Sequence, residues 1–323
     1  MATSAALRRA LLYVPSSSPR FLTKSLSLTT DNLTYDLEDS VSPSQKAPAR
    51  TLLHTHLSSL PSRPPTIREL AVRINAITTP HCLSDLTTLA FLPAVDALVI
   101  PKVNSAADLT FVTDVLRHVS PSRHSSSSSP DSKEKPIKLI ALIESALAIT
   151  NLPSICAASP YLDGLIFAAE DFALDLSLTR TPGLTEFLYA RSAIVTAARA
   201  FNLPSAIDLV CTEYRGEEGE RRLREESKGG KGLGFNGKQC IHPSQVGIVQ
   251  EMFAPSKEEV EWAVRVAIAD DKASAAGRGA WTLDGKMIDA PVSGKARAII
   301  KKAERCGFDI ESIKSQWQSQ EPE

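Results

Sequence analysis

Eight short, mostly apolar runs constrain the fold of this chain more than any other feature of its sequence. The runs cover residues 10–15, 34–39, 70–75, 97–102, 137–145, 162–171, 205–210 and 237–243. Several are almost wholly apolar rather than alternating, which is the pattern of strands buried on both faces of a parallel sheet. Helical patterns fit between them, for example at 105–119 and at 185–201, where one face carries Phe187, Ala190, Ile194 and Ala197.

The number of these units predicts an α/β protein built as a (β/α)8 TIM barrel. Eight strand–helix units over roughly 250 residues match the size of that fold. A doubly wound open sheet is the alternative, but it more naturally uses five or six strands. We therefore expect a barrel over residues 8–253. The pattern then changes, and residues 254–323 are interpreted as a C-terminal helical appendage with two helices around a Gly-rich, hairpin-like connection.

Composition excludes several classes of protein. The 323 residues are 43% hydrophobic and 23% charged, as in ordinary globular domains. A net charge of −1 with scattered basic residues argues against a nucleic-acid partner. No apolar run reaches the ~18 residues that a membrane span requires. The five cysteines form neither a CxxC pair nor a metal-ligand spacing, so we expect them to be packing residues in a reducing compartment.

Three segments carry weaker signals. The N-terminal residues are too few for a signal peptide and only faintly resemble a mitochondrial presequence, so the mitochondrial matrix and the cytoplasm both remain open. Residues 120–136 are rich in Ser and Pro and are interpreted as a mobile surface loop. Residues 232–237 read GLGFNG, but this motif precedes a strand instead of linking a strand to a helix, which argues against a dinucleotide loop.

Polar side chains gather at the carboxyl ends of the predicted strands, where the loops of a barrel build its active site. They are Tyr13, Asp36, Glu38, Asp39, Arg73, Asn75, Lys102, Glu144, Glu170, Asp171, Asp208 and His242. Taken singly, Asp39 or Glu170 is explained equally well as a helix cap, and His242 as a structural histidine. As a set, converging carboxylates repel one another unless a cation lies among them.

Carboxylates without cysteine favour a hard cation such as Mg²⁺, which takes one or two carboxylates together with water and substrate oxygens. Arg73 adds a fork of donors for a carboxylate or a developing oxyanion. A metal beside an arginine suggests an acidic substrate with an enolate-like transition state.

Eight motifs resemble the HpcH/HpaI aldolase/citrate lyase family, in order and in strand position, from about Arg8 to about Lys302. They are LLYVPSSSPRFLTK, YDLEDSVSPSQKAPAR, LAVRIN, VIPKVNSAADL, LIESALAI, FAAEDF, GKQCIHPSQV and GKMIDAP. Within the family, the citrate lyase β-like group is the most similar. The resemblance implies a (β/α)8 barrel, usually a homotrimer, that uses Mg²⁺ to cleave or form a C–C bond of a 3-hydroxyacyl-CoA thioester.

The same resemblance implies roles for the metal and catalytic residues. Glu144 and Asp171 match the family's two metal-ligating carboxylates, and Mn²⁺ is a possible substitute for Mg²⁺. Arg73 matches the arginine that contacts the substrate's oxygens. Asp289 matches an acid that transfers a proton in catalysis, delivered by the appended segment, which acts as a lid, commonly on a neighbouring subunit.

Further positions match the family's coenzyme A site. Tyr13, Arg20 and Lys24 fall where relatives hold the coenzyme A portion, and Ile241 and His242 match the lining of the acyl-CoA channel. The implied small molecules are therefore an acyl-CoA and a 2-keto acid, with coenzyme A as part of the substrate and no membrane partner.

Departures from the family pattern bear on the substrate. The usual VPG is VPS here, with Ser16, GGED is AAED, and a usual Gly is Ala148. The leading hypothesis is cleavage of citramalyl-CoA into pyruvate and acetyl-CoA. The alternatives are a malyl-CoA lyase or thioesterase, the citryl-CoA lyase subunit of a citrate lyase complex, and, in a different class, a non-catalytic acyl-CoA-binding barrel.

Overall fold

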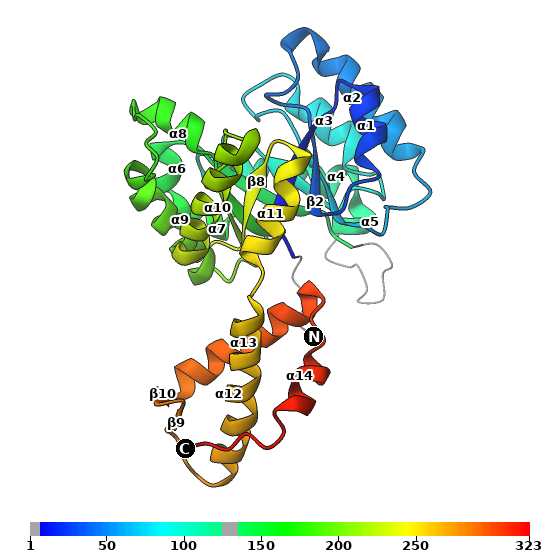
Figure 1. Cartoon of the computed structure of the whole chain (residues 1–323). Coiled ribbons are helices and arrows are strands. Elements are labelled where there is room, and N and C mark those ends of the chain that lie inside the picture. Colours follow the sequence, from blue (N-terminus) through cyan, green and yellow to red (C-terminus); the bar gives the residue numbers. More distant parts are fainter. Residues whose placement is uncertain (1–6, 125–134) are drawn as a thin grey trace. The chain divides into compact units, whose positions relative to one another are not determined.

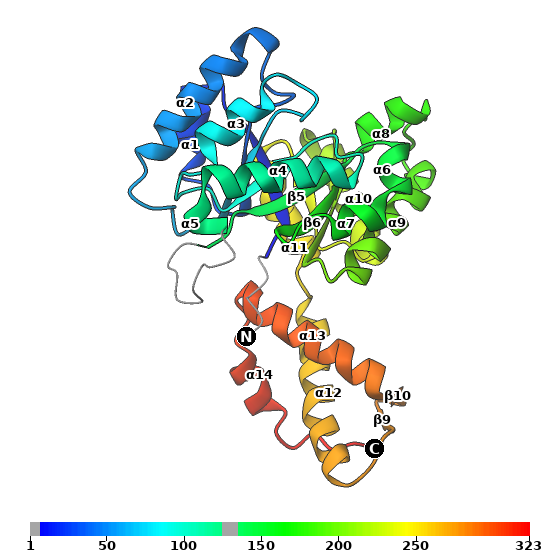
Figure 2. The ribbon, with the colours of Figure 1, turned by 180° about the vertical axis from the view of Figure 1, so that it is seen from behind.

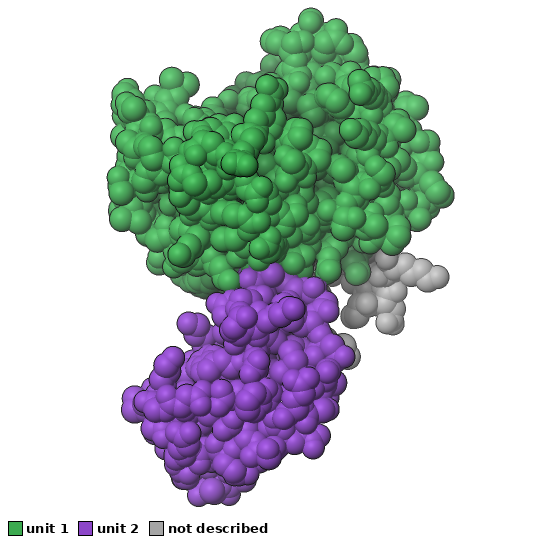
Figure 3. Space-filling model, in the orientation of Figure 1, with its two compact units in different colours: residues 1–253 green, residues 254–323 purple. Residues whose placement is uncertain are grey.

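The computed structural model describes residues 7–124 and 135–323. The chain divides into two compact units, residues 1–253 and 254–323 (Figures 1 and 3). Among the described residues, no helix is both long and apolar enough to cross a membrane.

The first unit is a closed barrel of eight parallel strands, which confirms the predicted fold. The strands are β1 (Ala10–Pro15), β2 (Thr30–Asp36), β3 (Ile67–Arg73), β4 (Ala97–Ile100), β5 (Lys138–Ile143), β6 (Leu162–Phe167), β7 (Ser205–Asp208) and β8 (Gly237–Cys240). Each pairs with the next in sequence, and β8 pairs with β1.

Helices cover the outside of the barrel. They are α1 (Pro19–Ser25), α2 (Lys46–Ser58), α3 (Cys82–Leu89), α4 (Ala106–Val119), α5 (Pro121–His124), α6 (Ala146–Thr150), α7 (Leu152–Ala157), α8 (Ala169–Leu176), α9 (Leu188–Ala200), α10 (Gly216–Leu233) and α11 (Pro243–Phe253). Short 3₁₀ turns occupy Pro43–Gln45 and Thr185–Phe187. Around the barrel, α3 contacts α4, α4 contacts α7, and α7 contacts α9 (Figure 2). Phe187, Ala190 and Ile194 are buried, as the helical pattern predicts.

The apolar core has two layers. A large cluster fills the space between the strands and the helices, where Leu33, Tyr35 and Phe167 are fully buried. A smaller cluster fills the inside of the barrel and contains Leu11, Ala71, Ala97, Val99, Ile140, Leu142, Ile166 and Ile207. Because both faces of the sheet are covered, strands such as β4, β5 and β6 are almost continuous apolar runs rather than alternating ones.

Strand β2 begins at Thr30 and β3 at Ile67, four and three residues earlier than the predicted starts at 34 and 70. Both starts contain buried polar residues, Thr30, Asp31 and Asn32 on β2 and Glu69 on β3, and Asn32 and Glu69 are paired with each other. Asn32 donates to Glu69 Oε2 at 2.7 Å. Glu69 also accepts hydrogen bonds from Nε and Nη2 of the buried Arg8, at 2.6 and 2.7 Å. A hydropathy pattern does not reveal such paired polar residues.

The barrel closes where the first and last strands meet. The Cβ of any residue replacing Gly237 would lie 2.0 Å from the backbone oxygen of Arg8, so only glycine allows this approach. We expect Gly237→Ala to destabilise the barrel by about 3 kcal/mol or more, since backbone must move. Urea unfolding would measure this. Gly232→Ala, where nothing lies within 4 Å of the new methyl, is the control, and an equal effect of the two would contradict the closure argument.

Two weaker predictions have different outcomes. Gly234, with φ 99°, ends α10, and Gly237 opens β8, so residues 232–237 link a helix to a strand as expected. The predicted loop 120–136 is wrong at its start, because residues 121–124 form α5, in which Arg123 and His124 are buried. Arg123 donates to carbonyl oxygens of the loop between α3 and β4, including Val95 O at 3.0 Å. Residues 125–134 lie outside the described part of the chain.

The second unit contains three helices and a hairpin, one helix more than predicted. They are α12 (Lys257–Ala275), β9 (Trp281–Leu283), β10 (Lys286–Ile288), α13 (Ala290–Cys306) and α14 (Ile310–Gln316). The strands β9 and β10 are antiparallel, and Asp284 and Gly285 between them both have positive φ, as a tight hairpin turn requires. The unit has its own small core, which contains Trp281, Leu283 and Ile288.

Candidate active site at the carboxyl ends of the strands

The carboxyl ends of β3 and β5 carry charged side chains above the apolar interior of the barrel. Arg73 follows the interior residue Ala71 by two positions, and Glu144 follows Leu142 in the same way. Because alternate residues of a strand share a face, both side chains continue the inward-facing rows. The barrel therefore presents Arg73 and Glu144 at its mouth.

Arg73 is held in one orientation by its neighbours. Its Nε and Nη2 donate to the two oxygens of Asp36 on β2, both at 2.7 Å. The Tyr13 ring of β1 lies beneath the guanidinium, 4.5 Å from ring centroid to Cζ. Burial alone would raise the pKa of Asp36, but the guanidinium outweighs it and the pKa is lowered. The remaining nitrogen, Nη1, lies 3.1 Å from Glu38 and donates to Asp39, which is 57% exposed, at 3.3 Å.

Glu38 is a buried carboxyl group without full hydrogen bonding. Its Oε2 has no hydrogen-bond partner with good geometry, although it lies 3.1 Å from Arg73 Nη1. Its Oε1 lies 3.6 Å from Lys102 Nζ. Burial raises the pKa of Glu38 to about 8, and the negative charges of Asp39 and Glu144 add to the rise against the opposing effect of Arg73. The mouth therefore has more carboxyl groups than its own cations neutralise.

Glu144 and Asp171 complete the carboxylate cluster. Glu144 Oε1 accepts a hydrogen bond from the backbone N–H of Lys102 at 3.1 Å. Burial raises the pKa of Glu144 to about 7, with a further contribution from the charge of Asp171. Asp171 lies in the first turn of α8, and its Oδ1 is 3.7 Å from Lys102 Nζ.

This donor set fits a magnesium ion. Within residues 7–124 and 135–323, no three His, Cys, Asp or Glu side chains gather closely enough to hold a metal ion by themselves. Mg²⁺ does not require such a cage, because it is usually held by one or two carboxylates with water and substrate oxygens in the remaining positions. Glu144 and Asp171 are all-oxygen donors that repel each other, so a divalent cation between them would relieve their repulsion.

Glu170, the neighbour of Asp171, has a different environment. It forms an ion pair with Nη1 of Arg180. Nη2 of Arg180 lies 2.9 Å from Glu226, whose second oxygen lies 2.9 Å from Nζ of the buried Lys238. Glu170 is thus the exposed end of a chain of charges that links the loop after α8 to β8, while Asp171 has Lys102 as its nearby cation.

Glu226 is the central carboxylate of that chain, and we expect Glu226→Gln to cost about 3–5 kcal/mol at pH 7 by leaving Lys238 buried and unpaired. Burial alone would raise the pKa of Glu226. The positive charges of Lys238 and Arg180 lower the pKa by a larger amount, so it falls below its ordinary value. The stability that this charge contributes is therefore present at neutral pH and lost as the pH falls below about 4.3.

Urea unfolding at pH 7 and pH 4 measures both effects. The exposed Glu251→Gln, which removes one partner of Arg224, is the control and should change stability by less than about 0.5 kcal/mol. A cost for Glu226→Gln that equals the control's would contradict the buried pairing.

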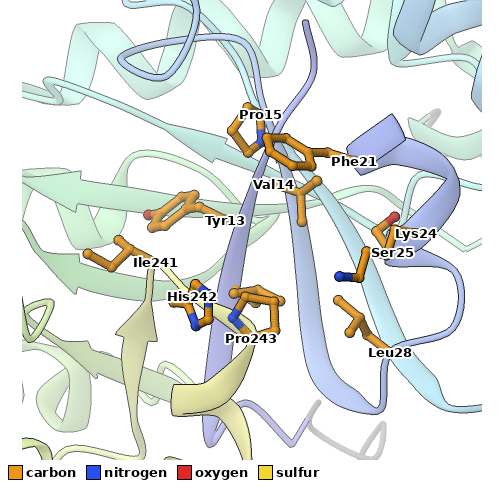
Figure 4. Close-up of a pocket in the computed structure, with 11 residues that line it drawn as sticks. Tyr13, Val14, Pro15, Phe21, Lys24, Ser25, Leu28, Ile241, His242 and Pro243 are labelled. Atoms are coloured by element: carbon orange, nitrogen blue, oxygen red, sulfur yellow. The ribbon is translucent and has the colours of Figure 1, made fainter. Parts of the chain in front are cut away.

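A pocket of about 290 Å³ opens beside the mouth (Figure 4). Its lining comes from β1, α1 and the loop after β8, and includes Tyr13, Val14, Phe21, Lys24, Ile241 and His242. Four predicted coenzyme A or channel residues are thus brought together. Arg20 is not part of the lining, but it lies on α1 four residues before Lys24, with its side chain exposed. Tyr13 belongs both to the pocket and to the Arg73 site.

Other strand-end residues are engaged elsewhere. Asp208 is buried against Arg191 of α9, 2.6 Å from Nη2, and so faces away from the mouth. Asn75 donates to Asp85 at 2.7 Å. Asp289 lies in the second unit, where it caps α13 by accepting a hydrogen bond from the N–H of Val292 at 3.2 Å.

Three residues at the mouth have roles that the sequence does not reveal. Asp36, Glu38 and Lys102 appeared only among polar residues at strand ends, because a sequence does not show which of them share contacts. The one available signal was position, since each follows directly on a buried run.

The sequence of this chain matches a known protein family. Residues 9–243 match the model of the HpcH/HpaI aldolase/citrate lyase family. The chain belongs to the HpcH/HpaI aldolase/citrate lyase family. The human mitochondrial citramalyl-CoA lyase is 33% identical over 307 residues, 92% of this chain and 85% of that protein. Citrate lyase subunit beta of Escherichia coli K12 is 34% identical over 303 residues, 93% of this chain and 95% of that protein.

Solved structures of the family agree with the fold. A CitE protein from Mycobacterium tuberculosis, in complex with magnesium, acetoacetate and coenzyme A, superposes with a TM-score of 0.71 at 30% identity, covering 93% of this chain and 99% of that chain. A citrate lyase from Burkholderia xenovorans reaches a TM-score of 0.77 at 19% identity, covering 95% and 96%, and supports the fold alone.

Ser16 replaces a glycine of the HpcH/HpaI pattern without adopting a backbone conformation that favours glycine. Ser16 is not among the described residues with positive φ, so the position does not require glycine in this chain. Its hydroxyl is buried without a hydrogen-bond partner.

Proposed function

We propose that this chain is a magnesium-dependent carbon–carbon lyase that acts on a 3-hydroxyacyl-CoA thioester. The preferred reaction is cleavage of citramalyl-CoA to pyruvate and acetyl-CoA. One observation carries the proposal: Tyr13 lines the pocket and also lies beneath Arg73, which joins a cavity suited to the pantetheine arm to a cluster of carboxylates and an arginine. The names of the family members, citramalyl-CoA lyase and citrate lyase, support it.

The pocket residues would hold coenzyme A. Lys24 in the lining and the exposed Arg20 on the same helix would supply positive charge for the phosphates of the ligand. Val14, Phe21 and Ile241 supply apolar contacts for the pantetheine chain. The thioester end would then lie beyond Tyr13, next to Arg73.

Glu144 and Asp171 would hold Mg²⁺, which polarises the oxygens of the 2-hydroxy acid end when it is bound. The orientation imposed by Asp36 leaves Nη1 of Arg73 as the edge that meets a substrate oxygen. The hydroxyl proton of the substrate would pass to solvent water, the C–C bond would break, and its electrons would pass to the thioester. The products are a keto acid and the enolate of acetyl-CoA, whose carbon Asp289 would protonate.

The second unit would act as a lid that delivers Asp289. Its position at the start of α13, directly after the β9–β10 hairpin, places the carboxylate at one end of a compact unit with a core of its own. We propose that the lid serves a neighbouring subunit of a homotrimer. An active mixture of Asp289→Asn chains with Arg73→Met chains, each inactive alone, would support this arrangement.

A substrate panel with purified protein tests the function. Citramalyl-CoA, malyl-CoA and citryl-CoA are incubated with Mg²⁺, with Mn²⁺ or with EDTA, and the keto acid and the free thiol are assayed. We expect pyruvate from citramalyl-CoA only with a divalent ion. Turnover of malyl-CoA alone would favour a malyl-CoA lyase, and release of free coenzyme A a thioesterase.

The same panel addresses the remaining alternatives. Product from citryl-CoA alone would favour a citrate lyase subunit. Absence of product from every thioester, with coenzyme A still bound, would favour a non-catalytic acyl-CoA-binding barrel. The presence of Arg73, Glu144, Asp171 and Asp289 together argues against that class, because a barrel used only for binding does not require them.

A further inference from the structure

Lys102, which immediately follows Pro101 at the end of β4, has an unusual backbone conformation. Its φ is 53°, in the left-handed region that non-glycine residues seldom adopt. The other described non-glycine residues with positive φ stand at helix ends or in the hairpin turn, and they are Ser177, Leu184, Asn202 and Asp284. A conformation that costs on the order of 1 kcal/mol persists only where its surroundings require it.

That conformation accompanies contacts with three carboxyl groups. The backbone N–H of Lys102 donates to Glu144 Oε1 at 3.1 Å. The ammonium Nζ lies 3.6 Å from Glu38 Oε1 and 3.7 Å from Asp171 Oδ1. Lys102 thus uses its main chain to fix one proposed metal ligand and its side chain to neutralise the other.

The ammonium group is also free to move. The Lys102 side chain is 43% exposed, whereas Arg73 and Glu38 are 11% and 7% exposed. Neither of its ion-pair distances is short enough for a tight hydrogen bond. A flexible four-carbon side chain that makes two loose ion pairs can exchange one of them without disturbing the barrel.

We propose that Lys102 is a tethered cation that competes with the divalent metal for Asp171 and pairs with the acidic end of the substrate once the metal is bound. Without metal, the ammonium neutralises Asp171 and Glu38. With metal on Glu144 and Asp171, the two cations repel each other, so the ammonium keeps Glu38 and turns to the carboxylate of the substrate. The inference rests on the proposed function, which supplies the metal ligands.

This role has two consequences of opposite sign. Removing the charge should tighten Mg²⁺ binding to the free protein by about tenfold, because a +1 and a +2 charge about 6 Å apart in a solvated site repel by about 1.4 kcal/mol, the energy of a factor of ten. The same change should weaken binding of a small 2-keto acid to the metal-loaded protein several-fold. General damage to the site would weaken both, so the opposite signs identify the tethered cation.

Isothermal titration of the full chain with MgCl₂, and then of the Mg²⁺-loaded protein with pyruvate, tests the proposal without turnover. Lys102→Met removes the charge and keeps a side chain of similar length. Lys102→Gly removes the charge and also adopts positive φ without strain, so it provides the test if Lys102→Met folds poorly. Lys102→Arg keeps the charge and should bind Mg²⁺ within about threefold of the unaltered protein.

Lys138 offers a matched control. It begins β5, at the amino-terminal end of the barrel and so at the end opposite the mouth, and its Nζ lies 3.2 Å from Asp163. Lys138→Met therefore also removes a lysine from an ion pair in the barrel. Its Mg²⁺ affinity should not change. If both Lys102→Met and Lys102→Gly bind Mg²⁺ no more tightly than the unaltered protein, the proposal for Lys102 is overturned. The assignment of Glu144 and Asp171 as metal ligands would still stand. Failure of the unaltered protein to bind Mg²⁺ would overturn the proposed function itself, and the inference with it.

Discussion

Asp171→Asn is expected to lower kcat/KM on the order of a thousandfold and to abolish activation by Mg²⁺. Asparagine keeps the shape of the side chain but not the negative charge, and a metal's stabilisation of developing charge amounts to several kcal/mol. The fold should be unaffected, because the Asp171 side chain is 38% exposed and its ion pair with Lys102 is long, at 3.7 Å. Steady-state kinetics across a Mg²⁺ series, with circular dichroism melting of both proteins, would measure the two effects.

Glu170→Gln is the matched control for this substitution. It changes the adjacent carboxylate in the same helical turn, but that carboxylate is paired with Arg180. We expect it to retain Mg²⁺ dependence. Unchanged Mg²⁺-dependent activity of Asp171→Asn would refute the ligand assignment. Loss of that dependence in Glu170→Gln alone would move the assignment to Glu170.

Asp289→Asn is expected to remove turnover, by about two to four orders of magnitude, while coenzyme A binding remains. General acid–base catalysis contributes an effect of this size. The asparagine amide oxygen can still accept the hydrogen bond from the N–H of Val292, so the cap of α13 is kept. Asp289→Ala removes both functions and should also destabilise the second unit by about 1 kcal/mol. Stopped assays and titration with coenzyme A would separate catalysis from binding.

Asp309 provides the comparison within the same unit. It caps α14 by accepting a hydrogen bond from the N–H of Ser312 at 3.0 Å, the structural role that Asp289 has for α13. Asp309→Asn should leave turnover unchanged. A fully active Asp289→Asn protein would assign proton transfer to another group, and equal losses in both variants would indicate a purely structural effect.

Much of the fold followed from the apolar runs. All eight predicted strands exist, because strands covered on both faces are mostly apolar and short apolar runs therefore mark most of them. The errors lie where burial is polar. The starts of β2 and β3 were missed because Asn32 and Glu69 satisfy each other inside the barrel. Helix α5 was missed because its buried Arg123 and His124 resemble a polar loop in sequence.

The candidate site was predictable as a position but not as a set of partners. Strand order alone places Arg73, Glu144 and Asp171 at one end of the barrel. It does not show that Asp36 orients Arg73 or that Asp208 turns away to pair with Arg191. These contacts depend on which side chains of neighbouring strands and of the covering helices meet, and strand order does not give that information.

The seam between β1 and β8 has a consequence for ligand binding. The pocket is built across it, with Tyr13 on one side and Ile241 and His242 on the other, residues more than two hundred positions apart in the chain. The pocket therefore exists only when the first and last strands are joined. A ligand bound there would favour the closed barrel over any form with the seam open, by an amount that grows with ligand concentration. Coenzyme A would hold the first and last strands of the barrel together, so the free energy of unfolding would rise with the concentration of coenzyme A.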